Sequence, residues 1–283
     1  MLVILLVASV LAESIVDKIN RLPTSTWVAK EYPSYVITQA KFRARLGTKL
    51  HHHATRPYRD NNALPDSFDA RERWPERMLP VRDQASCGSC WAFSIAEVVG
   101  DRLGIIGCPR GDMAPQDSVS CDQYDDGCDG GDMESAWQWL DEHGLATEEC
   151  LPYISGDGRV PVCPETCVDG SKIVRTPISG YKLLQPDEIQ QYLYDFGPLS
   201  LAFEVYFDFM FYSSGIYQHQ VGPLEGGHAV LLIGWGVEND VPYWLIQNSW
   251  GPDWGEEGHF RILRGSNECE CESDVTLAYP KCI

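Results

Sequence analysis

Apolar residues recur at helical spacing in three segments of the chain. In residues 90–103 they fall on one side of a helix with 3.6 residues per turn. The positions are Ala92, Ile95, Ala96, Val99 and Leu103. Residues 133–143 form a second predicted helix, which ends at Gly144. Residues 186–196 form a third, because they begin with a proline and carry two acidic residues in the first turn.

The pattern changes after Gly197. Short runs rich in valine, isoleucine and aromatic residues occupy residues 228–237, 242–248 and 258–264. Turns containing glycine, asparagine, aspartate and proline separate them, so they are predicted to be antiparallel strands. A helical front half and a β-rich back half indicate an α+β fold with two lobes.

The first twelve residues, 1–12, form an apolar run with small residues near its end. The run is too short to span a bilayer, and it has the features of a secretory signal peptide. A secretory route implies oxidising conditions, in which cysteines pair. The chain has 11 cysteines, so pairing ten of them would leave one thiol free.

Charge is distributed unevenly along the chain, whose formal net charge is −19. Residues 13–63 carry nine basic and four acidic side chains, a net of +5, and residues 64–283 carry a net of −24. An acidic body of this strength argues against nucleic acid as a partner. Residues 47–62 are polar and include three consecutive histidines, so they are predicted to form an exposed linker that a protease can cut.

The strongest chemical signal is the segment QASCGSCWAF, residues 84–93. Cys90 opens a predicted helix, whose positive dipole end stabilises a thiolate nucleophile. Two other interpretations of Cys87 and Cys90 are a redox pair and half of a zinc site. The first lacks a βαβ context, and the second lacks another cysteine or histidine pair of matching spacing.

Two further residues complete a candidate catalytic set. His228 begins one apolar strand, and Asn248 ends the next. Adjacent antiparallel strands bring such positions together, so Asn248 is expected to accept a hydrogen bond from one imidazole nitrogen and leave the other facing Cys90. Trp250 is expected to shield that contact from water.

From about Leu64 onward the chain resembles the papain-like cysteine proteases of the cathepsin B group. The resemblance is carried by the motif around Cys90 and by four further segments. They are residues 64–71 (LPDSFDAR), 128–131 (CDGG), 234–239 (GWGVEN) and 260–265 (FRILRG). It implies an α+β fold with a helical left lobe, an antiparallel β-barrel right lobe and an active site in the cleft between them.

The resemblance also implies a role for individual residues. Cys90 would be the nucleophile, His228 the general acid and base, and Asn248 the residue that orients the imidazole. Gln84 and the backbone N–H of Cys90 would form the oxyanion hole. The residues implied to contact substrate are Gly130, Gly131, Gly227, Ala229, Trp250 and Asp274. Gly130 and Gly131 would form the edge along which substrate lies, and Asp274 aligns with a carboxylate that receives arginine in the S2 pocket.

After the predicted signal peptide (1–12), the same resemblance implies an inhibitory prosegment (13–63) with Trp27 in a helix, and a catalytic domain (64–283). Within that domain, residues 64–175 are expected to be mainly the left lobe and residues 176–283 mainly the right lobe. The implied disulfides are Cys87–Cys128, Cys121–Cys163 and Cys150–Cys167. Partners of Cys108, Cys269, Cys271 and Cys282 stay open, with a bridge from Cys269 or Cys271 to Cys282 among the possibilities.

One segment departs from the family pattern. Residues 151–162, where cathepsin B carries a histidine-containing occluding loop, are short and contain no histidine. The chain is therefore expected to be mainly an endopeptidase, made as a zymogen that needs no metal or organic cofactor. Expected partners are extended polypeptides, its own prosegment and cystatin-type inhibitors. Nucleic acid and a membrane span are excluded, and the expected location is a lysosome-like compartment or the exterior.

Two alternatives come from other classes of protein. A catalytically silent homologue would bind peptides without cutting them, but the intact set of Gln84, Cys90, His228 and Asn248 argues against it. A disulfide-rich secreted binding module fits poorly with about 220 residues of body and a spare thiol.

Overall fold

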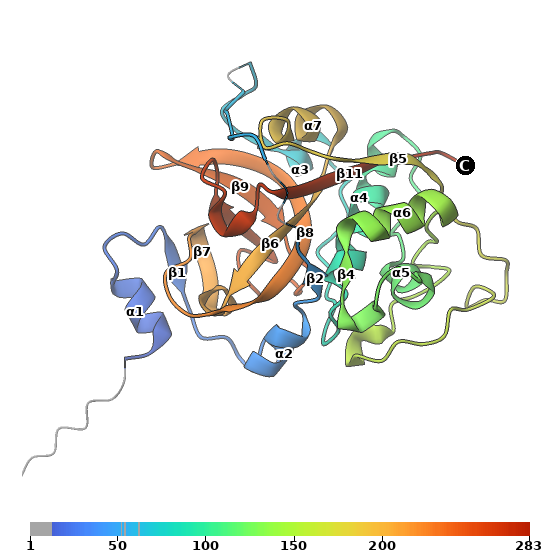
Figure 1. Cartoon of the computed structure of the whole chain (residues 1–283), viewed down its shortest axis with the longest axis horizontal. Helices are drawn as coiled ribbons and strands as arrows, with labels where there is room; N and C mark the ends of the chain where they lie inside the picture. The colour runs from blue at the N-terminus through green and yellow to red at the C-terminus, as the bar shows by residue number, and fades with distance from the viewer. Residues whose placement is uncertain (1–12, 52, 54, 62) are drawn as a thin grey trace, which may run out of the picture.

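The computed structural model describes residues 13–51, 53, 55–61 and 63–283, so the predicted signal peptide (1–12) lies outside the described residues. One half of the molecule is mainly helical and the other is built around a large sheet, as Figure 1 shows. The helical half contains α4 (Cys90–Ile105), α5 (Pro115–Cys121) and α6 (Met133–His143). Among the described residues, no helix is both long enough and apolar enough to cross a membrane.

The other half is built around a nine-stranded sheet with the order β1-β7-β10-β9-β8-β6-β11-β5, with β3 paired to β8. Its pairs are antiparallel except β7 with β10, which are parallel. The strands are β1 (Trp27–Ala29), β3 (Phe68–Asp69), β5 (Ile178–Leu183), β6 (Leu199–Tyr206), β7 (Tyr212–Tyr217), β8 (Leu224–Glu238), β9 (Val241–Gln247), β10 (His259–Leu263) and β11 (Asp274–Pro280).

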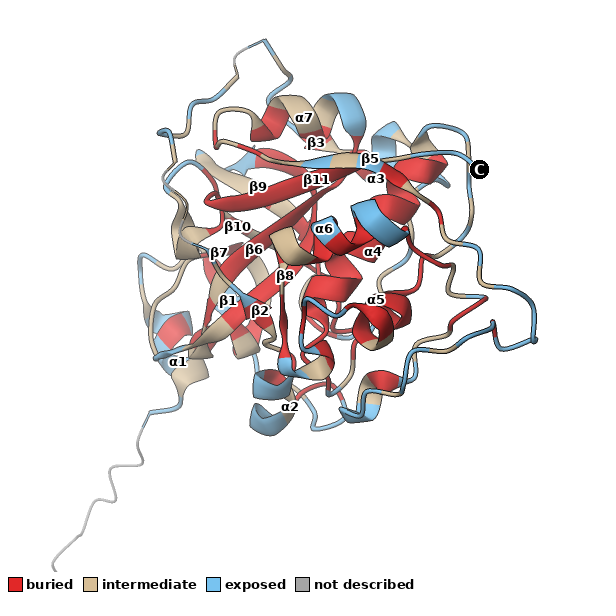
Figure 2. Ribbon diagram, turned by 45° about the vertical axis from the view of Figure 1, so that its right-hand side comes forward, coloured by how far each residue is buried: buried red, intermediate tan, exposed pale blue. Residues whose placement is uncertain are grey.

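Helix α4 lies at the centre of the molecule and packs against β8 and β11, with buried residues along almost its whole length (Figure 2). A helix that is buried on every side must satisfy its polar groups internally. Arg102 does so by donating hydrogen bonds to the carbonyls of Gly197, Pro198 and Ala278. Burial raises the pKa of Glu97 to about 8, so this carboxyl group is neutral at physiological pH. These contacts hold the helix that begins at Cys90.

The helix predictions for residues 90–103 and 133–143 are confirmed by α4 and α6. The third helix, α7 (Ile189–Phe196), begins three residues later than predicted. The Glu188 carboxylate accepts a hydrogen bond from Gln185 N at 2.9 Å, so the preceding residues form a turn. The three predicted strands are confirmed as β8, β9 and β10, with β8 starting earlier, at Leu224.

The front segment contains α1 (Ile15–Arg21), α2 (Gln39–Ala44), β1 and β2 (Thr48–Lys49). The predicted helix around Trp27 is wrong, because Trp27 begins strand β1 and pairs with β7. Trp27 and Ala29 are buried while Val28 is exposed, which is the alternation of a strand. Trp27 Nε1 donates to the carbonyl of Gln218 at 2.9 Å and anchors the strand to the body.

The prediction of an exposed linker from residue 47 is also wrong at its start. Thr48 is buried, and β2 pairs in parallel with β4 (Gly131–Asp132) of the body. His51 contacts the Asp132 carboxylate, and His53 Nε2 lies 3.8 Å from Glu134. Polar composition indicated solvent exposure here, but the backbone of this stretch finds hydrogen-bond partners on the body.

Four disulfides cross-link the chain. Three of them join the pairs that the family resemblance implies, Cys87–Cys128, Cys121–Cys163 and Cys150–Cys167. The fourth, Cys108–Cys282, excludes a bridge from Cys282 to Cys269 or Cys271. Cys90, Cys269 and Cys271 are free, so the expectation of a single spare thiol is wrong. Cys271 is fully buried and packs as a small apolar side chain.

Candidate active site

Cys90 is the first residue of α4 and is fully buried. The preceding residue, Ser89, directs its hydroxyl to Tyr153 Oη at 2.8 Å instead of capping the helix. The N–H groups of the first turn are therefore available to stabilise negative charge on the sulfur. Cys90 Sγ lies 3.0 Å from the hydroxyl of Thr48, which belongs to the front segment.

His228 on β8 and Asn248, which follows β9, lie together as predicted. His228 Nε2 donates to Asn248 Oδ1 at 2.8 Å, so the lone pair of the neutral ring is on Nδ1. Nδ1 is buried without a hydrogen-bond partner among the described residues. Burial lowers the pKa of His228 to about 3, so the imidazole is neutral in this covered state. The Trp250 ring lies 4.9 Å from the imidazole and covers it.

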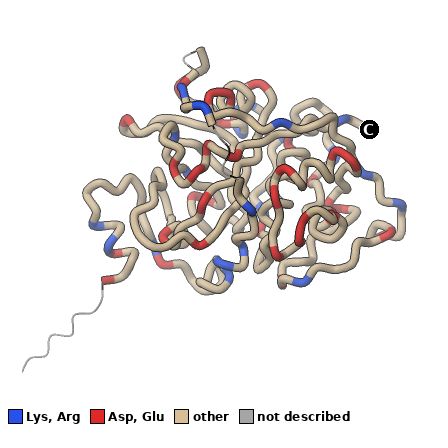
Figure 3. Tube along the Cα trace, in the orientation of Figure 1, with Lys and Arg blue, Asp and Glu red and all other residues tan. Residues whose placement is uncertain are grey.

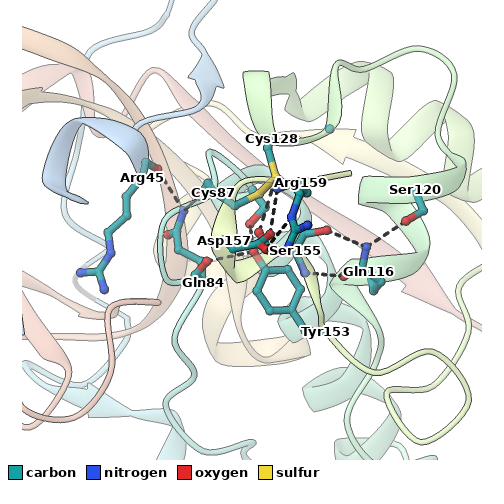
Figure 4. Close-up of a disulfide and its surroundings, with 12 residues drawn as sticks. Arg45, Gln84, Cys87, Gln116, Ser120, Cys128, Tyr153, Ser155, Asp157 and Arg159 are labelled. Carbon is teal, nitrogen blue, oxygen red and sulfur yellow. Dashed lines mark hydrogen bonds and ion pairs between the residues drawn. A yellow bond between two sulfur atoms is a disulfide. The ribbon is translucent and has the colours of Figure 1, made fainter. Parts of the chain in front are cut away.

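Gln84, the predicted oxyanion-hole donor, lies between Cys87 and the front segment. Its Nε2 donates to the carbonyls of Cys87 at 2.8 Å and Arg45 at 3.0 Å (Figure 4). Arg45 belongs to the front segment, so a backbone carbonyl of the chain itself accepts the hydrogen bond that Gln84 would otherwise donate to a ligand. Ser249 Oγ donates to Gln84 Oε1 at 2.7 Å, which fixes the orientation of the amide. Sequence reasoning missed Ser249, although it lies between two candidate residues, Asn248 and Trp250.

The glycine edge also binds the front segment. Gly131 N donates to the carbonyl of Gly47 at 2.9 Å. Gly130 has φ of +120°, and a Cβ atom at this position would lie 2.4 Å from that same carbonyl. Glycine is therefore required at residue 130 both by its backbone conformation and by the close approach of another chain segment.

The remaining predicted contacts lie on neighbouring strands. A Cβ atom on Gly227 would lie 2.1 Å from the carbonyl of Thr48. Ala229 on β8 and Asp274 on β11 both pair with Ala202 of the intervening strand β6, and both are buried. Burial raises the pKa of Asp274 to about 7, with the nearby His51 acting in the opposite direction.

Opposite charges join the front segment to the body. Arg43 pairs with Glu225 at 2.5 Å, Arg45 with Asp83 at 2.9 Å and Lys49 with Asp126 at 2.6 Å. Figure 3 shows basic residues along the front segment beside the more acidic body. Most of these pairs are partly exposed, where each contributes about 1 kcal/mol or less.

Taken together, residues 45–51 contact a thiol at a helix N-terminus, a carboxamide donor and a glycine edge. The same body holds an imidazole that is hydrogen-bonded to a second carboxamide. This arrangement is that of a cysteine protease in its zymogen form.

The chain belongs to the papain family of cysteine proteases, because the model of that family (Papain family cysteine protease) matches residues 64–279. It is a cathepsin B-like member and hence a cysteine peptidase. It is 49% identical to cathepsin B-like CP3 of Giardia intestinalis over 219 residues, which cover 75% of this chain and 73% of the relative. It is 38% identical to cathepsin B-like cysteine proteinase 5 of Caenorhabditis elegans over 260 residues, 78% of this chain and 76% of the relative.

The fold matches solved structures of proforms. Procathepsin B S9 from Trypanosoma congolense superimposes with a TM-score of 0.86 at 34% identity, covering 96% of this chain and 99% of that chain. Digestive procathepsin L 3 of Tenebrio molitor superimposes with a TM-score of 0.73 at 28% identity, covering 90% of this chain and 83% of that chain. These matches establish the papain-like α+β fold and support the front segment as the chain's own inhibitor.

Proposed function

We propose that the chain, once its front segment is removed, is a cysteine endopeptidase that cuts extended polypeptides. The observation that carries this proposal is the position of the front segment, whose Arg45 carbonyl accepts from Gln84 while Thr48 contacts Cys90. A polypeptide thus lies against both the predicted nucleophile and the predicted oxyanion-hole donor. Removal of the front segment would free the same positions for substrate.

The chemistry follows from these positions. Cys90 Sγ adds to the scissile carbonyl carbon, and His228 Nδ1 takes the thiol proton. Gln84 Nε2 and the Cys90 backbone N–H donate to the oxyanion. His228 then protonates the leaving amine as the C–N bond breaks, which leaves a thioester. Water attacks the thioester with His228 as the base, and the acid product and the Cys90 thiol are released. Asn248 keeps Nδ1 directed at the sulfur throughout.

The short segment of residues 151–162 leads us to propose endopeptidase rather than carboxydipeptidase activity. Its exposed side chains include Arg159, whose guanidinium already pairs with the carboxylate of Asp157 in the same segment. We expect an internally quenched peptide to be cut at the same rate with a free and with an amidated C-terminus. Strict dependence on the free carboxylate would contradict this proposal.

Asp274 is proposed to receive arginine in the S2 pocket. A buried carboxylate makes a charge-assisted pair with guanidinium. The variant Asp274→Ala is therefore expected to lower kcat/KM for an Arg-Arg reporter by about tenfold more than for a Phe-Arg reporter. The preference for Arg-Arg should also rise with pH in the wild type, since the carboxyl group is charged above its pKa. Equal losses on both reporters would show that Asp274 has no part in selectivity.

We also propose an acidic compartment, or secretion, as the site of action. Protonating the carboxylates that face Arg43, Lys49 and Arg56 removes the attraction that holds the front segment. Acid therefore favours release of the segment, so the enzyme would become active when it reaches an acidic compartment. Cystatin-type inhibitors, which would bind the same cleft, are proposed as partners on the family resemblance alone.

A further inference from the structure

Arg45 is the charged residue of the front segment that is buried most completely, with a side chain that is 0% exposed. Its Nε donates to the carbonyl of Ala85 at 2.9 Å, and its Nη2 donates to Asp83 Oδ1 at 2.9 Å. The guanidinium carbon lies 5.5 Å from the centre of the Trp250 ring. A carboxylate, a carbonyl and an aromatic face together form a site that fits a guanidinium group.

All three pocket residues belong to the catalytic body. Asp83 and Trp250 are paired in a β-bridge, which holds the carboxylate beside the indole. Asp83 Oδ1 accepts from Ala85 N at 2.8 Å and stabilises the left-handed backbone of Ala85, with φ of +57°. The Ala85 carbonyl and the Asp83 carboxylate are thus held in place by contacts that do not involve the front segment. We call Asp83, Ala85 and Trp250 the Asp83 pocket.

The front segment also shows on which side of the Gln84 donor this pocket lies. Following the segment, Arg45 has its side chain in the Asp83 pocket and its carbonyl on the Gln84 donor, and Gly47 and Thr48 then lie along the glycine edge at Gly131. The Asp83 pocket and the glycine edge therefore lie on opposite sides of the Gln84 donor. If substrate lies along the glycine edge up to the scissile bond, the Asp83 pocket receives the residue beyond that bond.

Electrostatics favours a cation in this pocket. Asp83 is also approached by a second basic side chain, Lys41, whose Nζ lies 3.8 Å from Oδ2. Removing the front segment takes both cations away and leaves the carboxylate beside an apolar ring. A substrate with arginine at this position restores the charge-assisted hydrogen bonds, whereas a neutral side chain makes no ion pair with the carboxylate.

We propose that the Asp83 pocket selects polypeptides that carry arginine, or less favourably lysine, immediately after the scissile bond. The preference for arginine follows from the two separate acceptors, Asp83 Oδ1 and the Ala85 carbonyl, which match the forked guanidinium. This inference rests on the proposed peptidase function and adds a substrate class to it.

The test compares internally quenched peptides that differ only in the residue after the cleaved bond, which is arginine, citrulline or leucine. Citrulline keeps the shape of arginine without its charge. Product masses identify the bond that is cut in each peptide. We expect the activated wild-type enzyme to show kcat/KM about tenfold higher for arginine than for citrulline.

The variant Asp83→Asn keeps an oxygen that can accept from Ala85 N and removes the charge. We expect it to bring the ratio of arginine to citrulline close to one. The matched control is Asp253→Asn, which removes an exposed carboxylate from the loop beyond Trp250 and should keep the wild-type ratio.

Two failures are distinguishable. If the wild type cuts arginine and citrulline peptides equally, or if Asp83→Asn keeps the preference, the Asp83 pocket does not select substrate although the peptidase function stands. If the activated chain cuts no peptide at all, the proposed function is wrong and the inference falls with it.

Discussion

The variant Cys90→Ser is expected to lower kcat/KM for peptide hydrolysis by about a thousandfold or more. A serine hydroxyl at this position has a much higher pKa than a thiol, and the neutral His228 imidazole is too weak a base to ionise it. The mutation exchanges sulfur for oxygen at a buried site, so the fold should be kept, and unchanged thermal unfolding would confirm this. Hydrolysis of a Phe-Arg reporter after acid activation is the measurement.

The matched control is Cys269→Ser, at another free thiol. Burial and the neighbouring Glu268 raise the pKa of Cys269 well above its usual range, so this thiol is a poor nucleophile. We expect Cys269→Ser to keep most of the activity. Full activity in Cys90→Ser, or an equal loss in both variants, would contradict the assignment of the nucleophile.

The variant Gly47→Val is expected to raise the activity of the uncleaved zymogen at neutral pH by about tenfold or more. A Cβ atom on Gly47 would lie 1.9 Å from the carbonyl oxygen of Gly88, which is backbone and cannot turn aside. The segment cannot move away without losing the hydrogen bond from Gly131 N to the Gly47 carbonyl. The variant should therefore need less acid than the wild type to release its front segment.

Ala40→Val is the control for this variant, because Ala40 is an exposed position of α2 in the same segment. It introduces the same valine side chain where there is space, so its activation should follow the wild type in both pH and salt dependence. A Gly47→Val zymogen that stays as silent as the wild type at neutral pH would show that residues 45–51 do not inhibit. If activation of the wild type depended on neither pH nor salt, ion pairs would not be what holds the front segment on the body.

Much of the body could be predicted from local patterns. Helix α6 follows from its apolar spacing and the glycine that ends it, and α4 follows from the apolar run after Cys90. The partnership of His228 and Asn248 could be predicted because consecutive antiparallel strands place their ends side by side. In each case the information lies within a few residues of the element or in one hairpin.

The path of the front segment could not be predicted in this way. Trp27 forms a strand because β7 offers it a hydrogen-bonding edge, and β2 forms because Gly131 leaves its N–H open. Neither partner is near in sequence. The Cys108–Cys282 bridge has the same origin, since its cysteines are 174 residues apart. The role of Ser249 depends on its hydrogen bond to Gln84, and the role of Asp83 depends on its hydrogen bond from Arg45. Neither contact is evident from the sequence.

Labelling with a thiol-reactive epoxide tests whether Cys90 is the nucleophile and whether His228 activates it. The zymogen is activated by acid, the epoxide is added, and the modified residue is mapped by mass spectrometry in the wild type and in His228→Ala. We expect a single adduct on Cys90, complete loss of peptidase activity on labelling, and much slower labelling of the variant. An adduct on Cys269 or Cys271, or equal labelling rates with and without the imidazole, would contradict this expectation.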